Sequence, residues 1–161
     1  MIDAAAAAGL DEIVVVLGHE AAAVAASLGL PDGARVVANP GYRGGQSTSL
    51  RCGLEAADPR SEAALVLLGD QPRLPAELIR AAIDAFRDAG MPVLRTFFGA
   101  VPGHPVVVAR SEWAALAAVR GDAGGRRLWD SSPRVARLEV DGAPPADVDT
   151  WEQYQTLVGG R

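Results

Sequence analysis

The sequence contains no lysine, and all 15 of its basic residues are arginines. A phosphate-loop lysine and a Schiff-base lysine are therefore excluded within these residues. Cysteine is almost as scarce: Cys52 stands alone, which excludes an internal disulfide and fits a reducing cytoplasm. Because no histidine lies near it in the sequence, we interpret Cys52 as a packing residue rather than a nucleophile.

Long apolar runs and excess positive charge are also missing. No run approaches the length of a membrane span, and the net charge of -5 argues against a nucleic-acid surface. No basic region precedes an apolar stretch at the N-terminus, so we expect no secretory leader and a cytoplasmic protein. With 49% hydrophobic and 22% charged residues, we expect a single folded domain over residues 1–161.

Short apolar runs alternate with helical stretches along the chain. Residues 13–17 and 64–68 are continuous apolar runs, typical of strands buried on both faces of a parallel sheet. Further strands are predicted at 35–38, 93–95, 106–108 and 135–140, with helices between them. This alternation predicts a three-layer, mostly parallel, Rossmann-like α/β sheet.

Asp70 follows the run at 64–68. In open α/β sheets, ligands bind beyond the carboxyl ends of the strands. Gly69 lets the backbone approach a ligand closely, and Pro72 stops the strand. A carboxylate at this edge can hold a hard cation such as Mg²⁺ and, through it, phosphate oxygens. The alternative is that these residues form an ordinary turn.

A second polar segment joins the strand at 35–38 to a predicted helix. It runs from Asn39 through a glycine-rich stretch to Ser47, which we predict to be the helix N-cap, and on to Ser49. Backbone N–H groups at a helix N-terminus attract anions, and the amide of Gln46 can pair with a nucleobase edge. The alternative is a capped helix with a polar loop and no ligand.

Weaker signals come from two histidines and a second glycine-rich turn. His104 lies between a glycine and a proline before the predicted strand at 106–108, and His19 follows the strand at 13–17. The turn at 121–126 resembles an anion-binding turn, in which Arg126 can pair with phosphate. The alternatives are structural histidines and a solvated arginine.

Two carboxylates, Asp147 and Asp149, precede a predicted final helix at 151–158. At a spacing of two on an extended segment, their side chains point in opposite directions, so only one would face the site. Asp149 can join Asp70 around one metal. It can also cap the final helix, and the two roles are compatible.

Taken in order, these motifs resemble the MobA-like nucleotidyltransferases, most closely the molybdenum cofactor cytidylyltransferases. The resemblance covers nearly the whole chain, and its most specific parts are the Gly-Gln-Ser-x-Ser-Leu and Gly-Asp-Gln-Pro motifs. The matching segments are Ala8-Gly9-Leu10-Asp11, Leu17-Gly18-His19-Glu20, Asn39-Pro40-x-Tyr42, Gly45-Gln46-Ser47-x-Ser49-Leu50, Leu68-Gly69-Asp70-Gln71-Pro72, Gly103-His104-Pro105, Gly121-Asp122-x-Gly124 and Asp147-x-Asp149-Thr150.

The resemblance implies a nucleotidyl transfer. CTP or another NTP binds with Mg²⁺, or with Mn²⁺, and the phosphate of a molybdopterin-type acceptor attacks the α-phosphorus while pyrophosphate leaves. Asp70 and Asp149 match the catalytic, metal-binding carboxylates. The implied nucleotide-binding residues are Asn39, Gly45, Gln46, Ser47, Ser49, Gly69 and Gln71. The implied acceptor-binding residues are His104, Asp122, Gly124 and Arg126.

Family members begin with a strand and a glycine-rich loop that carries arginine and lysine. Residues 2–10 match the helix that follows this unit, so we expect a sheet lacking its first strand, between the strands at 13–17 and 64–68. We also expect residues 1–161 alone to be inactive. Two other functions stay open: a related transferase acting on a phospho-sugar or phospho-alcohol, and a catalytically inactive nucleotidyltransferase-like module that binds a molybdoenzyme or its maturation factor.

Overall fold

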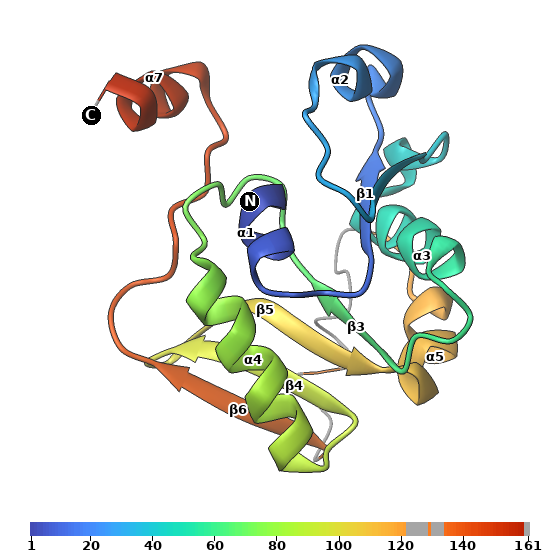
Figure 1. Ribbon diagram of the computed structural model, residues 1–161, viewed down its shortest axis with the longest axis vertical. Helices are drawn as coiled ribbons and strands as arrows, with labels where there is room; N and C mark the ends of the chain where they lie inside the picture. The colour runs from blue at the N-terminus through green and yellow to red at the C-terminus, as the bar shows by residue number, and fades with distance from the viewer. Residues whose placement is uncertain (122–128, 130–133, 160–161) are drawn as a thin grey trace.

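The computed structural model describes residues 1–121, 129 and 134–159, and Figure 1 shows their helices and strands. None of the described helices is long and apolar enough to cross a membrane. In chain order the elements are α1 (Ile2–Ala7), β1 (Ile13–Leu17), α2 (Ala21–Ser27), β2 (Ala34–Ala38), η1 (Tyr42–Gly44), α3 (Gln46–Ala56), β3 (Ala63–Val66), α4 (Ala76–Ala89), β4 (Val93–Phe98), β5 (Val101–Ala109), η2 (Arg110–Glu112), α5 (Trp113–Ala118), β6 (Val135–Val140) and α7 (Trp151–Gly159).

The strands form two sheets. β1 and β2 pair in parallel, and the second sheet has the order β3-β5-β4-β6. β4 and β6 are parallel, whereas β5 runs antiparallel to both β3 and β4. The expected mostly parallel α/β class is confirmed. Among the described strands, β5 is the one that runs antiparallel to its neighbours. The β4–β5 hairpin was not expected: Gly103-His104-Pro105 lies inside β5 rather than before a strand.

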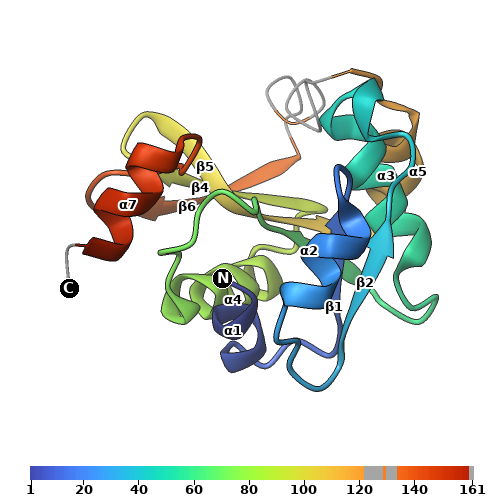
Figure 2. The same ribbon diagram turned by 90° about the horizontal axis from the view of Figure 1, so that it is seen from above.

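Helices cover the strands on two sides (Figure 2). On one side, α1 and α4 pack over an apolar cluster of Ala5, Leu74, Leu78, Ile79 and Phe98. On the other side, α3 and α5 pack over a cluster that includes Leu54, Val106, Val108, Trp113 and Leu116. The predicted three-layer arrangement is therefore present, and both helix layers reach across the two sheets.

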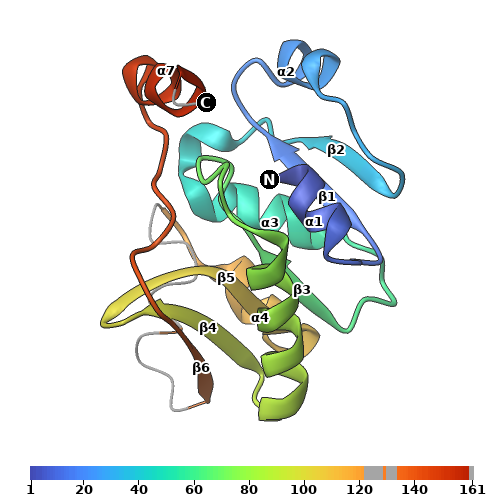
Figure 3. The ribbon, with the colours of Figure 1, turned by 60° about the vertical axis from the view of Figure 1, so that its left-hand side comes forward.

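The strands expected to be buried on both faces are only half-buried. Every residue of β1 and β3 keeps intermediate exposure, whereas most of β4 and the middle of β5 are buried. The reason is a cavity of about 1460 Å³ lined by both β1 and β3. These two strands belong to separate sheets, as Figure 3 shows. The expectation of full burial is therefore wrong for both strands.

Candidate functional site

Asn39, at the end of β2, fixes the loop that leads into α3. It is 5% exposed, and its backbone N–H donates to the Leu17 carbonyl at 2.8 Å. Its Nδ2 donates to Thr48 Oγ1 at 2.9 Å and to Ser49 Oγ at 3.0 Å, while its Oδ1 accepts from the Gly41 N–H at 2.9 Å. One buried amide therefore holds the strand end, the loop and the first turn of α3 together.

The predicted N-cap at Ser47 is wrong. α3 begins at Gln46, and its N-cap is Gly45, whose φ of 94° is a conformation that favours glycine. Ser47 is only 1% exposed, and its Oγ has no hydrogen-bond partner among the described residues. Its backbone N–H donates to the Gly121 carbonyl at 3.1 Å, so part of the donor capacity at this helix start is already used.

Asp70 lies four residues beyond the end of β3, at the carboxyl edge of the sheet. Its backbone carbonyl accepts the Val148 N–H at 2.8 Å, which brings the 147–149 segment alongside it. Its Oδ1 is buried and has no partner in the described part of the chain. Burial is the largest cause of its raised pKa, its own N–H opposes that shift, and the carboxylates of Asp147 and Asp149 raise the pKa further.

Gln71 links this segment to Asp147. Its side chain is buried, and Nε2 donates to Asp147 Oδ1 at 2.9 Å. Its Oε1 is a further buried acceptor without a partner among the described residues. Sequence reasoning chose Asp149 alone for the site, but the structure brings both carboxylates to Asp70. The motif containing both aspartates was the available signal for Asp147.

Thr150, rather than Asp149, supplies the side-chain cap of α7. Thr150 Oγ1 accepts the Gln153 N–H at 3.2 Å, and Gln153 Oε1 accepts the N–H groups of Asp149 and Thr150 at 2.7 and 2.9 Å. This reciprocal pattern is a capping box. The carboxylate of Asp149 is therefore not needed for the cap, and the capping alternative for that residue is wrong.

The two predicted nucleotide-binding segments face one space. Gln46 and Ser49 line the cavity between the sheets, and Gly69, Gln71 and Asp147 line it as well. Ser47 and Asn39 are buried behind this surface. The loop before α3 and the loop after β3 therefore border the same cavity, but Asp70 and Asp149 are not among the residues that line it.

Arg95 is a cavity-lining residue that sequence reasoning missed. It lies on β4, is 6% exposed, and its guanidinium is 5.6 Å from the Phe97 ring centroid and 5.9 Å from that of Trp129. Half-buried His104 lines the same cavity. The overlooked signal was an arginine within an apolar strand. The predicted acceptor-binding positions Asp122, Gly124 and Arg126 lie outside the described residues.

Fold and site together define an α/β protein with carboxylate and amide side chains at the carboxyl end of β3, beside a large cavity. Residues 1–136 match the model of the MobA-like NTP transferase domain, and the chain belongs to that family of nucleotidyltransferases.

Two structures of Rv0371c from Mycobacterium tuberculosis are each 35% identical to this chain. One matches 98% of this chain and 80% of its own with a TM-score of 0.84. The other, a manganese complex, matches 98% and 83% with a TM-score of 0.81. These similarities extend over nearly all of the chain.

Two further similarities are more limited. The bifunctional protein GlmU of Sorangium cellulosum is 38% identical over 102 residues, which is 58% of this chain. The match spans only about a fifth (21%) of GlmU. The 4-diphosphocytidyl-2C-methyl-D-erythritol synthase of Anaerococcus prevotii is 16% identical, with 99% and 83% of the two chains covered and a TM-score of 0.75. That likeness concerns the fold alone.

Proposed function

We propose that this protein transfers a nucleoside monophosphate, with CMP as the first candidate, from an NTP to a phosphorylated acceptor of the molybdopterin type. The observation that carries the proposal is a set of buried oxygens without partners in the described structure: Ser47 Oγ, Asp70 Oδ1 and Gln71 Oε1. Buried polar atoms are nearly always hydrogen-bonded. Two such atoms on the adjacent residues Asp70 and Gln71, with a third at the start of α3, favour a polar ligand beside them.

The donors at this edge fit a divalent cation. Mg²⁺ in nucleotide enzymes is held by one or two carboxylates together with phosphate oxygens and water. Asp70 and Asp149 would supply those carboxylates, with Asp147 beside them. No group of three described His, Cys, Asp or Glu residues is placed to hold a metal by itself, so phosphate oxygens and water would have to complete the coordination. The manganese complex of Rv0371c supports the same choice of metal class. A cation bound there would neutralise triphosphate charge.

The loop before α3 would bind the nucleoside. The exposed Gln46 amide can donate to and accept from a nucleobase edge, and Asn39 holds the loop in place. The proposed nucleotide-binding set is Asn39, Gly45, Gln46, Ser47, Ser49, Gly69 and Gln71. On the acceptor side the proposed set is His104, Asp122, Gly124 and Arg126, and Arg95 adds a buried guanidinium to the cavity.

The reaction is a displacement at phosphorus. An oxygen of the acceptor phosphate forms the new bond to the α-phosphorus, the bond to the bridging oxygen breaks, and its electron pair leaves with pyrophosphate. No side chain needs to form a covalent intermediate, so the protein contributes positioning and charge stabilisation. Within residues 1–161, which contain no lysine, arginine and histidine are the side chains that can bring positive charge to a phosphate.

The test measures Mn²⁺ and CTP binding by calorimetry, and pyrophosphate release with CTP, GTP, ATP or UTP. Each nucleotide is combined with a molybdopterin-type, phospho-sugar or phospho-alcohol acceptor. Turnover is measured on residues 1–161 and on the same residues together with any coding sequence that lies in frame upstream. Asp70→Asn should abolish metal-dependent nucleotide binding, whereas Asp88→Asn, an exposed control on α4, should leave it unchanged.

The outcomes separate the candidate functions. Pyrophosphate release only with a phospho-sugar or phospho-alcohol would replace the molybdopterin-type acceptor. Binding of metal and nucleotide without turnover in either form would support an inactive binding module. Equal Mn²⁺ binding by the wild type and Asp70→Asn would remove Asp70 from the proposed site.

A further inference from the structure

β6 is an edge strand of the β3-β5-β4-β6 sheet and lies at the outside of the molecule in Figures 1 and 3. Among the described residues its ladder partner is β4 alone, and no backbone group of residues 135–140 is hydrogen-bonded outside that ladder. The β4–β6 register is unbroken over all 6 residues, and β6 contains neither proline nor glycine. A regular edge of this kind presents backbone N–H and C=O groups to another strand.

The two faces of β6 differ in polarity. Ala136, Leu138 and Val140 are half-buried and pack against apolar clusters that include residues of α4. Arg137 and Glu139 are exposed and alternate with them, so both charges lie on the opposite face of the strand. β6 therefore carries an apolar row on one face and one charge of each sign on the other.

The two charged side chains of β6 are already ordered. Arg137 Nε donates to Glu139 Oε1 at 2.7 Å, and the guanidinium lies 3.4 Å from the centroid of the Phe97 ring. The Arg137 and Glu139 side chains nevertheless keep 49% and 58% of their surface exposed. Charged residues on an edge strand usually oppose pairing with another chain. Because these two have opposite signs, their effect on pairing depends on the register in which a second strand approaches.

A second copy of β6 can pair in the antiparallel direction about a two-fold axis perpendicular to the sheet. Directly opposed residues then lie on the same face, so the axis passes through a residue and not between two. An axis through Arg137 sets two arginines opposite each other, and an axis through Glu139 sets two glutamates opposite each other. An axis through Ala136 or Val140 leaves neither charge facing its opposite. An axis through Leu138 places each Arg137 opposite the partner's Glu139, with Cβ atoms about 4.5–5.5 Å apart.

We propose that β6 joins two copies of this chain, which pair their β6 strands antiparallel about a two-fold axis through Leu138. This symmetric register pairs opposite charges twice, and on the apolar face it sets Leu138 against its own copy and Ala136 opposite Val140. Because Arg137 and Glu139 are held in place before association, little side-chain freedom is lost on pairing. The proposal rests on the sheet edge and is independent of the proposed nucleotidyl transfer, so either can fail without the other.

Sedimentation equilibrium on residues 1–161 tests the dimer. The weight-average mass should rise from 16.6 kDa toward twice that value between about 5 and 500 μM, because an interface of one strand pair is small and therefore weak. Arg137→Glu and Glu139→Arg should each weaken association at least about tenfold, since each sets like charges directly opposite one another. Asp32→Arg, an exposed charge reversal before β2 in the other sheet, should leave association unchanged.

A mixture of the two β6 variants separates contacts between chains from contacts within one chain. Arg137→Glu has two acidic residues at these positions and Glu139→Arg has two basic ones, so neither variant keeps the ion pair within its own chain. Across the proposed axis, each acidic position of one variant faces a basic position of the other. An equimolar mixture should therefore associate to within about threefold of the wild type. The double variant, Arg137→Glu with Glu139→Arg, should dimerise as well.

Amide hydrogen exchange locates the interface. When the wild-type concentration is raised from about 5 to about 500 μM, alternate amides of β6 should exchange at least about threefold more slowly, because they become hydrogen-bonded across the axis. The amides of β2, in the other sheet, should not change. This measurement needs no variant, so it remains decisive if either charge reversal fails to fold.

Several results would overturn the proposal. A mass of 16.6 kDa at every concentration would show that the chain does not self-associate. If the wild type dimerises but the mixed variants do not, the contact lies elsewhere. Loss of the dimer in Trp151→Ser, with the β6 charge variants unaffected, would assign the contact to the exposed Trp151 and Tyr154 of α7. Concentration-dependent exchange confined to residues outside β6 would also exclude the edge pairing.

Discussion

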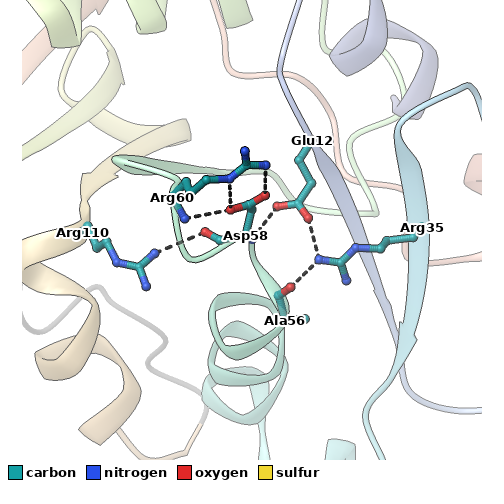
Figure 4. Close-up of polar contacts among 6 residues, drawn as sticks. All are labelled: Glu12, Arg35, Ala56, Asp58, Arg60 and Arg110. Atoms are coloured by element: carbon teal, nitrogen blue, oxygen red, sulfur yellow. Dashed lines mark hydrogen bonds and ion pairs between the residues drawn. The ribbon is translucent and has the colours of Figure 1, made fainter.

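The carboxylates at the two edges of the sheet region differ in whether they have hydrogen-bond partners. At the amino edge, the carboxylates of Glu12 and Asp58 are hydrogen-bonded to neighbouring groups, as Figure 4 shows. At the carboxyl edge, Asp70 keeps a buried oxygen without a partner in the described structure and stands near two more carboxylates. Paired charges hold segments together. Unpartnered oxygens in a crevice are suited to a cation or another polar ligand.

Two aspartates make the contrast explicit. Hydrogen bonds from Arg60, first from its side chain and then from its backbone, lower the pKa of Asp58 to about 2. Burial, followed in effect by the charges of Asp147 and Asp149, raises the pKa of Asp70. The ionised form of an aspartate is therefore favoured at the amino edge and disfavoured at the carboxyl edge. A bound cation would favour the ionised form of Asp70 and lower its pKa.

The largest expected effect follows from removing the Asp70 charge. Asp70→Asn should lower metal-dependent turnover of the active form by on the order of 10²–10³-fold, the usual loss when one preorganised electrostatic group is removed. Pyrophosphate release and Mn²⁺ titration measure this change. Retention of full activity would show that the Asp70 carboxylate does not contribute to metal-dependent turnover.

The same substitution should have the opposite effect on the metal-free protein. Because the folded pKa of Asp70 is raised, wild-type stability rises as the pH falls through that pKa, and the gain is complete below about 3.8. At neutral pH, Asp70→Asn should therefore unfold at a higher denaturant concentration than the wild type. A lower midpoint would contradict the idea that the ionised Asp70 carboxylate lowers the stability of the metal-free protein.

Asn39 tests the support behind the nucleotide loop. Asn39→Ala removes the donor shared by Thr48 and Ser49 and the acceptor of the Gly41 N–H. We expect a loss of about 1–3 kcal/mol in the free energy of unfolding, because buried polar groups lose their partner. CTP affinity should fall as well. Denaturant titration and calorimetry measure the two effects, and Asn39→Asp separates the lost acceptor from the lost donors.

Glu12 tests the amino edge. Its carboxylate accepts from Arg35 at 2.5 Å and from the Asp58 N–H at 2.9 Å, while Arg35 also donates to the Ala56 carbonyl. Glu12→Gln should cost about 1–2 kcal/mol in the free energy of unfolding, since hydrogen bonds to a charged group are lost. Glu77→Gln, in an exposed pair with Arg80, should cost less than about 1 kcal/mol. Mn²⁺ binding should not change in either variant.

Much of the framework could be predicted from the sequence because apolar periodicity and turn residues are local signals. The strand at 13–17 has the predicted bounds, and the one at 135–140 does as well. The position of Asp70 at the carboxyl edge could be predicted because the carboxyl ends of parallel strands meet at one edge of a sheet. The motif resemblance identified a family that the comparison confirms over residues 1–136.

What the sequence could not show depends on long-range pairing. The β4–β5 hairpin joins residues whose local pattern looked like two short separate strands. The N-cap prediction at Ser47 was wrong because Gly45, with a φ of 94°, is the N-cap of α3. Composition does not reveal this backbone conformation. Half-burial of β1 and β3 was equally invisible, since burial depends on what lies beside a strand and not only on the strand itself.

The smallest effect concerns the acid dependence of the amino edge. Since the folded pKa of Asp58 is lowered to about 2 from 3.8, its stabilising contribution is present above about pH 4 and is lost as the pH falls toward 2. The stability difference between wild type and Asp58→Asn should therefore shrink over that interval. Urea titrations from pH 5 to pH 2 measure the difference, and a constant difference would show that Arg60 does not hold the Asp58 carboxylate. Because the raised pKa of Asp70 gives the opposite slope, one pH series on both aspartate variants distinguishes the paired edge from the unpaired one.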